Sequence, residues 1–430
     1  MRRHALELLK NWKDDSERKP LILKGARQVG KTWLMKEFGR TCYDNFVYFN
    51  FDEDDELKTI FEKNKNPERI IELLSLISGK RIEKKKTLII FDEVQECPNA
   101  LNSLKYFKEN AGDYHIISAG SLLGTLLSQP KSYPVGMVNL INIYPLTFGE
   151  FLEAVQPELY EYYGKIKKDV QPEEYFHTRL TEAYNTYLII GGMPECVASW
   201  IKYKDPERVA RIQRELIEIY ENDFSKHNGS INSGRILMVF RSIVSQLAKQ
   251  NEKFVYGAVR SGARAREFEE AIEWLVSAGM VNRVYNISKP EHPLPAFDKI
   301  EQFKLFLFDT GLLKMMAGVD NSAILLKTDY QFKGALTENY VLQQLKGCFD
   351  CDPRYYADKD GEIDFIVQNK TQIIPIEVKG GEDKSAPSFK KYISVYNPKY
   401  AVRFSKRGYR TDGKITNVPL YLAEKMKELI

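Results

Sequence analysis

Residues 25–32 combine glycine, lysine and threonine at a spacing suited to holding phosphate. The segment reads Gly25-Ala26-Arg27-Gln28-Val29-Gly30-Lys31-Thr32 and fits the pattern G-x-x-x-x-G-K-[ST]. Gly25 and Gly30 let the backbone turn, so that its N–H groups can approach phosphate oxygens. Lys31 places a positive charge on the β and γ phosphates, and Thr32 offers a hydroxyl to Mg²⁺. The spacing therefore predicts a P-loop that binds ATP and Mg²⁺.

The neighbouring residues favour this interpretation. Residues 21–23 are apolar and indicate a buried strand, and the residues from Trp33 onward can continue a helix whose positive end faces the anion. A glycine-rich turn before an ordinary helix is the alternative. We expect the nucleotide to contact the following residues: Gly25, Ala26, Arg27, Gln28, Val29, Gly30, Lys31, Thr32 and Trp33.

Two acidic residues follow a second apolar run. Residues 87–91 read as a buried strand that ends in Asp92 and Glu93. With a P-loop in the same chain, Asp92 is expected to hold Mg²⁺, and Glu93 to orient or deprotonate the attacking water. Lys31 and Glu93 are thus the predicted catalytic residues. Two solvent-facing acids at a strand end are the alternative.

A third strand offers a polar residue near the same edge. Residues 115–118 indicate a strand, and Ala119-Gly120-Ser121 follow it. Ser121 is a candidate sensor of the γ-phosphate, and a structural serine in a turn is an equally good interpretation.

Acidic and basic residues also cluster in the last hundred residues. Asp364, Glu377 and Lys379 form the pattern D-x₁₂-E-x-K on two expected strands, residues 362–367 and 373–378. A turn between these strands brings Asp364 and Glu377 together, and period-two alternation puts Glu377 and Lys379 on one face. Glu338, on an expected helix over residues 333–346, can join them. Surface ion pairs on a sheet edge are the alternative.

These pieces resemble a known group of proteins. The chain is similar to prokaryotic AAA-type ATPases whose P-loop domain precedes a domain of unknown function with a restriction-endonuclease-like, PD-(D/E)XK core. Beyond residues 25–32 and 91–93, the resemblance rests on further short segments at residues 119–121, 144–151, 191–195, 308–312 and 334–341.

The resemblance implies roles for the C-terminal cluster. Asp364, Glu377 and Glu338 would bind Mg²⁺, and Glu377 and Lys379 would be catalytic. A fold that only binds is the alternative, because fold does not fix function. One departure concerns the nucleotide site: the group often has a basic residue after the glycine before the fifth strand, and here the pair is Gly136-Met137. This departure argues against fast hydrolysis. Arg27, inside the loop, is a candidate partial substitute, and a solvent-facing side chain is an equally good interpretation.

Residues 232–310 have the order of a winged helix. Expected helices at 234–249, 255–260 and 264–277 precede expected strands at 281–287 and 303–308. Arg260, Arg264 and Arg266 suit DNA, but Glu267, Glu269, Glu270 and Glu273 on the same helix would repel phosphate. DNA contact and a protein-packing or autoinhibitory role both stay open, and the charge favours the second.

The whole chain is predicted to be of the α/β class, with the P-loop domain built on a parallel sheet. The expected domains are an AAA-type P-loop core at 1–150, a helical lid at 151–230, a winged-helix-like segment at 231–318 and a restriction-endonuclease-like α/β domain at 319–430.

Composition sets the remaining limits. The 430 residues carry 63 basic and 59 acidic side chains, a net charge of +4, which is too small to require a nucleic-acid partner. Five scattered cysteines fit a reducing compartment, and Cys348 and Cys351 have no second pair with which to complete a zinc site. No apolar run is long enough to span a bilayer. We expect a cytoplasmic protein without a membrane partner.

Together these features predict an AAA-type ATPase whose Mg-ATP binding and hydrolysis control a nuclease-like domain. ATP is the expected ligand, and DNA and a second copy of the chain are candidate partners. The alternative is a nucleotide-controlled, non-catalytic scaffold with a degenerate nuclease fold that only binds.

Overall fold

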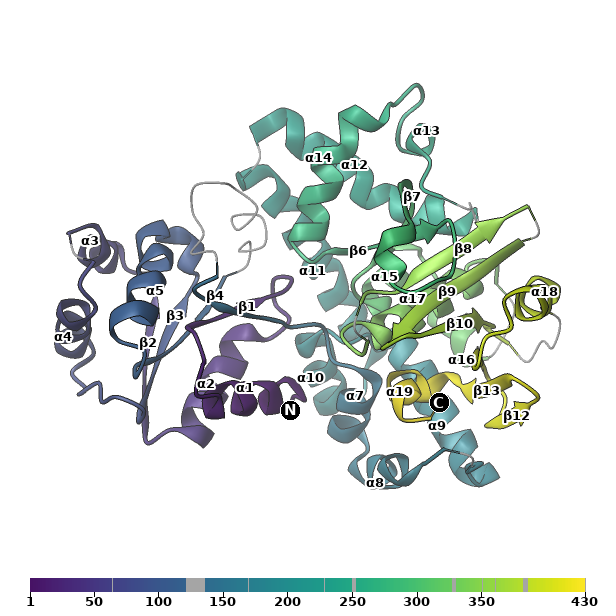
Figure 1. The fold of residues 1–430 in the computed structure, drawn as a ribbon, viewed down its shortest axis with the longest axis horizontal. Coiled ribbons are helices and arrows are strands. Elements are labelled where there is room, and N and C mark those ends of the chain that lie inside the picture. The colour runs from purple at the N-terminus through teal and green to yellow at the C-terminus, as the bar shows by residue number, and fades with distance from the viewer. Residues whose placement is uncertain are drawn as a thin grey trace. The chain divides into compact units, whose positions relative to one another are not determined.

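The structure is a computed structural model. It describes residues 1–63, 65–120, 136–168, 170–227, 229–249, 253–326, 330–349, 351–359, 361–381 and 386–429. The chain divides into two compact units (Figure 1). The first contains residues 1–144 and 277–280, and the second contains residues 145–276 and 281–430.

The first unit is built on a five-stranded sheet in the order β2-β3-β4-β1-β5, in which every pair of neighbours is parallel. The strands are β1 (Leu21–Lys24), β2 (Asn45–Asn50), β3 (Thr87–Asp92), β4 (His115–Ala119) and β5 (Asn139–Asn142). All six residues of β3 are buried, as expected for a strand covered on both faces. The predicted parallel sheet of an α/β fold is confirmed.

Helices alternate with these strands along the chain. They are α1 (Ala5–Asp14), α2 (Lys31–Cys42), α3 (Asp55–Lys63), α4 (Pro67–Ser78), the short η1 (Val94–Glu96) and α5 (Pro98–Asn110). Helix α2 packs against β2, β3 and β4. Because β1 leads directly into α2, the turn between them lies at the carboxyl end of the sheet, where α/β proteins bind ligands.

The second unit begins with a run of helices. They are α7 (Phe148–Val155), α8 (Pro157–Lys165), α9 (Glu174–Ile190), α10 (Pro194–Tyr203), α11 (Pro206–His227), α12 (Gly229–Ala248), α13 (Tyr256–Val259) and α14 (Ala265–Ser277). The side chains of Thr147 and Glu150 form a reciprocal capping box that starts α7. No helix among the described residues has the length and apolar character needed to cross a bilayer.

An eight-stranded sheet occupies the rest of the second unit, in the order β12-β13-β11-β10-β9-β8-β6-β7. Its strands are β6 (Val281–Ile287), β7 (Asp298–Leu307), β8 (Arg354–Asp358), β9 (Gly361–Asn369), β10 (Gln372–Val378), β11 (Ala401–Ser405), β12 (Arg410–Asp412) and β13 (Ile415–Pro419). The helical elements between and after them are η2 (Leu294–Phe297), α15 (Thr310–Met316), α16 (Asn321–Leu325), α17 (Lys333–Leu345), α18 (Pro387–Tyr396), η3 (Leu420–Lys425) and α19 (Met426–Leu429).

The C-terminal elements follow a simple order. Helix α17 precedes an antiparallel meander of β8, β9 and β10, and α18 then leads to β11, which pairs with β10 in parallel. Helix α17 packs against β10. The register pairs Ile376 with Phe365. One further step of that register puts Glu377 opposite Asp364.

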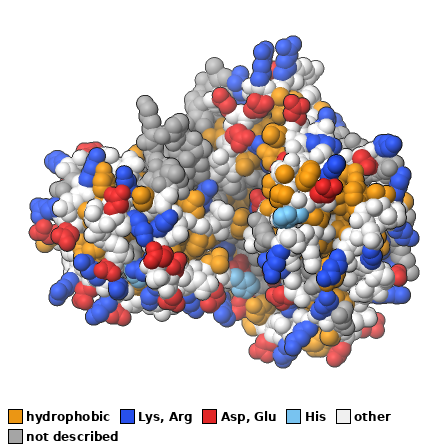
Figure 2. All heavy atoms as spheres, in the orientation of Figure 1, with side chains coloured by type: hydrophobic (Ala, Val, Ile, Leu, Met, Phe, Trp, Pro, Cys, Tyr) orange, Lys and Arg blue, Asp and Glu red, His pale blue; other side chains and the backbone are white. Residues whose placement is uncertain are grey.

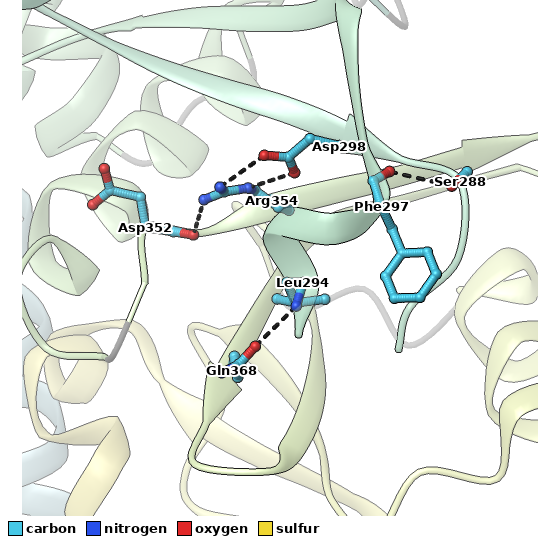
Figure 3. A network of polar contacts seen from close by, with 7 residues as sticks. All are labelled: Ser288, Leu294, Phe297, Asp298, Asp352, Arg354 and Gln368. Carbon is cyan, nitrogen blue, oxygen red and sulfur yellow. Dashed lines mark hydrogen bonds and ion pairs between the residues drawn. The ribbon is translucent and has the colours of Figure 1, made fainter. Parts of the chain in front are cut away.

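The β6–β7 hairpin is fixed to this C-terminal sheet. Strand β6 pairs with β8 at Asn286 and Tyr355. The Arg354 guanidinium makes two bonds to the carboxylate of Asp298, at 2.8 and 2.9 Å (Figure 3). Figure 3 also shows the Leu294 N–H donating to Gln368 Oε1, at 2.9 Å. The hairpin that follows helices α12–α14 is therefore continuous with the C-terminal strands.

A buried carboxylate joins three helices of the second unit. Asp309 is 0% exposed, and it accepts bonds from the N–H of Gly192 at 2.7 Å, the N–H of Leu312 at 3.0 Å and Gln343 Nε2 at 3.3 Å. Gly192 follows α9, Leu312 lies in α15 and Gln343 lies in α17. A Cβ on Gly311 would lie 2.6 Å from the nitrogen of Gly191, so the backbones approach closely there.

Replacing Asp309 should destabilise the second unit strongly. In Asp309→Ala, buried donors lose their acceptor, and we expect the free energy of unfolding to fall by about 3 kcal/mol or more. Urea unfolding followed by circular dichroism measures it. The matched control is Asp320→Ala, which removes the exposed N-cap of α16 and should cost less. Equal losses in both variants would contradict the role given to Asp309.

His115 should make the first unit sensitive to acid. Its ring is buried and bonded to the hydroxyl of Tyr43, and burial lowers the pKa of His115 to about 4. The folded pKa lies below the ordinary value, so the stabilisation is complete above about pH 6.5 and is lost as pH falls toward 4. We expect a loss of about 2 kcal/mol after allowing for solvent screening.

Hydrogen exchange of peptides from β1 and β4 between pH 4 and 7 measures this loss, once corrected for the intrinsic pH dependence of exchange. The control is His115→Phe, which cannot titrate and should show a smaller change across the same range. The same pH dependence in both proteins would exclude His115 as its source.

Candidate functional site

The predicted P-loop has the backbone geometry of an anion cradle. Gly25, Gln28 and Gly30 have φ angles of 143°, 64° and 93°, in the left-handed region. A side chain on Gly25 would collide with the carbonyl oxygen of Ile143, so only glycine fits there. Gly30 is the N-cap of α2, and the N–H groups that begin this helix are available to an anion.

Lys31 lies at the centre of this cradle. Its side chain is buried, and its ammonium group donates to the carbonyl oxygens of Gly25 at 2.8 Å and Ala26 at 2.7 Å. Burial lowers the pKa of Lys31 to about 8, while Glu93 and Asp92 act in the opposite direction. A buried ammonium group whose partners are neutral carbonyls is well placed to bind a phosphate oxygen.

The second predicted motif meets the first at the end of β3. The Thr32 hydroxyl donates to Asp92 Oδ2 at 2.7 Å, so the two residues expected to hold Mg²⁺ are in direct contact. Burial raises the pKa of Asp92, opposed by hydrogen bonds from Thr32 and Tyr48. A hydroxyl and a carboxylate side by side are oxygen ligands of the kind Mg²⁺ prefers, so these residues fit the ion.

Glu93 has an unusual backbone conformation for a residue with a side chain. Its φ is 48°, which is uncommon outside glycine and is found at functional sites. Its carboxylate accepts a bond from Gln95 Nε2 at 2.6 Å. The strained turn places Glu93 directly after Asp92, as the sequence predicts for a residue that orients water.

The structure adds two residues to this site. The Tyr48 hydroxyl donates to Asp92 Oδ2 at 3.0 Å, and Gln95 binds Glu93. Neither belongs to a motif, and both are brought in by tertiary structure: β2 lies beside β3, and η1 turns back after Glu93. An amide two residues after the acid is a weak signal for Gln95. No local signal identifies Tyr48.

The other predicted nucleotide contacts have mixed surroundings. Trp33 is 43% exposed, Val29 and Ala26 are buried, and Arg27 is half-buried. Arg27 lies close enough to Lys31 to lower its pKa. Met137 is half-buried beside Gly136, whose carbonyl accepts a bond from Lys19 at 2.6 Å. Ser121 lies outside the described residues, so its predicted role stays a prediction.

The second candidate site is a pocket of about 370 Å³ inside the second unit, lined by three acidic and three basic side chains; it is called the acidic pocket below, after its carboxylates. Charged residues from several elements line it. They are Lys253, Lys304, Glu338, Glu362, Asp364 and Lys379. The apolar part of its wall includes Leu247, Phe254, Leu305, Ala335 and Val378. Here α17, β9 and the end of β10 meet residues from α12 and the β6–β7 hairpin.

The structure brings the predicted C-terminal residues together. Asp364 Oδ2 accepts a bond from the Val378 N–H at 2.6 Å, and Lys379 pairs with Glu377 Oε1 at 2.8 Å. The predicted placement of Glu377 and Lys379 on one face is therefore correct. Glu377 Oε2 and Arg403 Nε are buried and make no hydrogen bond in the described part of the chain.

The carboxyl groups of Glu338, Asp364 and Glu377 all have raised pKa values. Burial, followed by the charge of Asp364, raises the pKa of Glu338 to about 8 and the pKa of Glu377 to about 7. Burial also raises the pKa of Asp364. Carboxyl groups gathered in a low-dielectric pocket favour the neutral form or a nearby cation.

The acidic residues nevertheless do not form a ready metal site. Within the described ranges, no group of three or more His, Cys, Asp or Glu side chains is arranged so that it could hold a metal ion. The metal role expected for Glu338, Asp364 and Glu377 therefore stays a prediction.

The basic residues considered for DNA contact are partly neutralised. Arg260 pairs with Glu267, and Glu273 of the same helix pairs with Arg283 of β6, at 2.7 Å. Figure 2 shows Lys and Arg side chains close to Asp and Glu side chains over α13 and α14. Arg403, near the C-terminal end of the described chain, is half-buried and pairs in register with Glu377. Any attraction for a phosphate backbone in these two places is weakened by adjacent acids.

Comparison with known families divides the chain into three parts. Residues 17–152 match the family model of the AAA domain. Residues 181–323 match a domain of unknown function (DUF8612), and residues 333–423 match another domain of unknown function (DUF4143). The first match and the parallel sheet make residues 17–152 an AAA-type P-loop domain, which supports ATP binding. No curated protein matches the chain.

Among solved structures, the chain is similar to the Walker-type ATPase PABY2304 of Pyrococcus abyssi. The identity is 14%, the coverage is 74% of this chain and 95% of that one, and the TM-score is 0.47. It is also similar to the Aeropyrum pernix ORC1 protein in complex with DNA, with 12% identity, coverage of 76% and 95%, and a TM-score of 0.28.

AMPPCP-bound DnaA from Aquifex aeolicus shows 14% identity, coverage of 64% and 87%, and a TM-score of 0.29. All three similarities are too distant to support a functional argument.

Proposed function

We propose that this protein binds and hydrolyses Mg-ATP at residues 25–32, 92 and 93, and that the nucleotide controls a restriction-endonuclease-like domain at its C-terminal end. The contact between Thr32 and Asp92 carries the first part, because it joins the two motifs beside the buried ammonium of Lys31. Mg²⁺, when bound there, would neutralise phosphate charge. Lys31 would bind phosphate, and Glu93 would position the water.

The second part is supported by the C-terminal architecture. The order of α17, three antiparallel strands, α18 and a parallel strand matches what a PD-(D/E)XK core requires, and Asp364, Glu377 and Lys379 lie at its centre. The function of such a core depends on its site rather than on its fold. DNA is the candidate ligand of this domain, and a second copy of the chain is a candidate partner.

Lys31→Ala should remove ATP binding. The variant deletes a buried, charge-assisted contact, and we expect at least a hundredfold loss of affinity, equivalent to about 2.7 kcal/mol. Calorimetric titration of the full chain with Mg-ATP measures it. Arg40→Ala is the matched control, because Arg40 is exposed in the last turn of the same helix. If Lys31→Ala binds ATP as well as the parent, the site assignment is wrong.

Glu93→Gln separates binding from hydrolysis. It keeps the shape of the side chain but removes its charge, so ATP should still bind while turnover falls by a factor of 10² or more. If the unaltered protein binds ATP tightly but turns it over far more slowly than ~1 s⁻¹, the nucleotide-controlled, non-catalytic scaffold is favoured instead. Met137, in place of the basic residue often found there, fits that outcome.

A binding-only nuclease fold is the second candidate for the C-terminal domain. It is supported by the finding that, in the ranges described, no group of three or more His, Cys, Asp or Glu side chains is arranged to hold a metal ion. We expect the full chain to leave linear and supercoiled DNA uncut in Mg²⁺ or Mn²⁺, with and without ATP. Gel electrophoresis after long incubation tests this. Cleavage that disappears in Asp364→Ala would show an active nuclease and exclude the binding-only interpretation.

A further inference from the structure

Lys304 reaches the acidic pocket from outside the C-terminal block of α17 to β11. It lies on β7, its side chain is 12% exposed, and it lines the pocket with Glu338, Glu362 and Asp364. Its ammonium group forms an ion pair with Glu362 and lies 5.2 Å from the centre of the buried Tyr355 ring. The position of the Lys304 ammonium group is therefore set by the carboxylate of Glu362 and the ring of Tyr355.

The strand that carries Lys304 is firmly attached to the strands that carry the acids. Lys304 pairs in register with Val284 of β6, and β6 pairs with β8 beside Tyr355. Two hydrogen bonds from the Arg354 guanidinium to the Asp298 carboxylate hold the start of β7 against β8 (Figure 3). The strand that carries Lys304 thus belongs to the same sheet as the strand that carries Glu362 and Asp364.

The charges in the pocket explain why a cation is needed. Lys379 pairs with Glu377 at one side, while Lys304 interacts with Glu362, Glu338 and Asp364. Buried carboxylates without a compensating cation are strongly unfavourable. A divalent metal with carboxylate ligands would meet the same need.

We propose that Lys304 is a built-in cation that takes the electrostatic place of a divalent metal in this pocket. Its ammonium group is paired with Glu362 and offsets part of the negative charge of Glu338 and Asp364 without a metal. The proposal rests on the nuclease-like assignment above and gives a physical reason for a fold that binds rather than cuts. Removing the ammonium group should convert the pocket into a metal site.

The test is Mn²⁺ binding by the full, nucleotide-free chain. Lys304→Met keeps the length of the side chain and removes its charge, and we expect it to bind Mn²⁺ at least tenfold more tightly than the unaltered protein. Electron paramagnetic resonance of free Mn²⁺ measures the affinity. Mn²⁺ should also raise the melting temperature of Lys304→Met and leave that of Lys304→Arg nearly unchanged.

Two controls localise the effect. Lys299→Met removes a lysine from the same strand outside the pocket lining and should behave like the unaltered protein. Adding Asp364→Asn to Lys304→Met should abolish the gain in Mn²⁺ affinity. If Lys304→Met folds only when Mn²⁺ is present, the proposal is supported as well, because the metal then replaces the lost cation.

Two results would overturn the proposal: a folded Lys304→Met that binds Mn²⁺ no more tightly than the unaltered protein, or failure of Lys304→Met to fold even with Mn²⁺. Neither depends on the nucleotide site. A failure of the ATPase assignment would be seen in the ATP titration of Lys31→Ala and in the turnover of Glu93→Gln.

Discussion

The second unit is organised around the buried carboxylate of Asp309. A carboxylate removed from water is tolerated only when donors surround it, so Gly192, Leu312 and Gln343 must keep their positions relative to one another. These donors come from the turn after α9, from α15 and from α17. Helix α17 also carries Glu338 into the acidic pocket. The geometry of the pocket therefore depends on a hydrogen-bond network that lies away from its own charged groups.

This network also gives a physical meaning to short motifs that carry no evident chemistry. The glycine pair after α9, the segment that begins at Asp309, and α17 are far apart in the sequence but adjacent in the second unit. The Phe148 N–H likewise donates to Gln344 Oε1 at 2.8 Å, which ties the start of α7 to α17. Such residues are needed for close backbone approach and buried donors. These segments therefore serve the packing of the second unit. The proposed chemistry is assigned to other residues.

Sequence reasoning succeeds where local pattern decides the outcome. The apolar run of β3, the glycine positions of the P-loop and the alternation of Glu377 and Lys379 are all readable from neighbouring residues, and the structure agrees with each. Tyr48, Gln95 and Lys304 could not be found in this way, because strand order and hairpin register bring them to their sites. Strands β8 and β13 were not anticipated either, since their short, mixed sequences lack a clear period.

The shared sheet limits how the C-terminal pocket can be controlled. Because β6 and β7 pair into the same sheet as β8 to β13, Lys304 cannot leave the acids by a simple rigid movement of that hairpin without breaking the Arg354–Asp298 pair and the β6–β8 contact. Helix α12 and residues 253–254, which line the same pocket, belong to no strand of the sheet. If the proposed nucleotide control holds, it is more easily expressed as a movement of this helical wall than as a displacement of Lys304. Such a movement would alter access to the pocket and the position of Lys253, while Lys304 stays beside the acids.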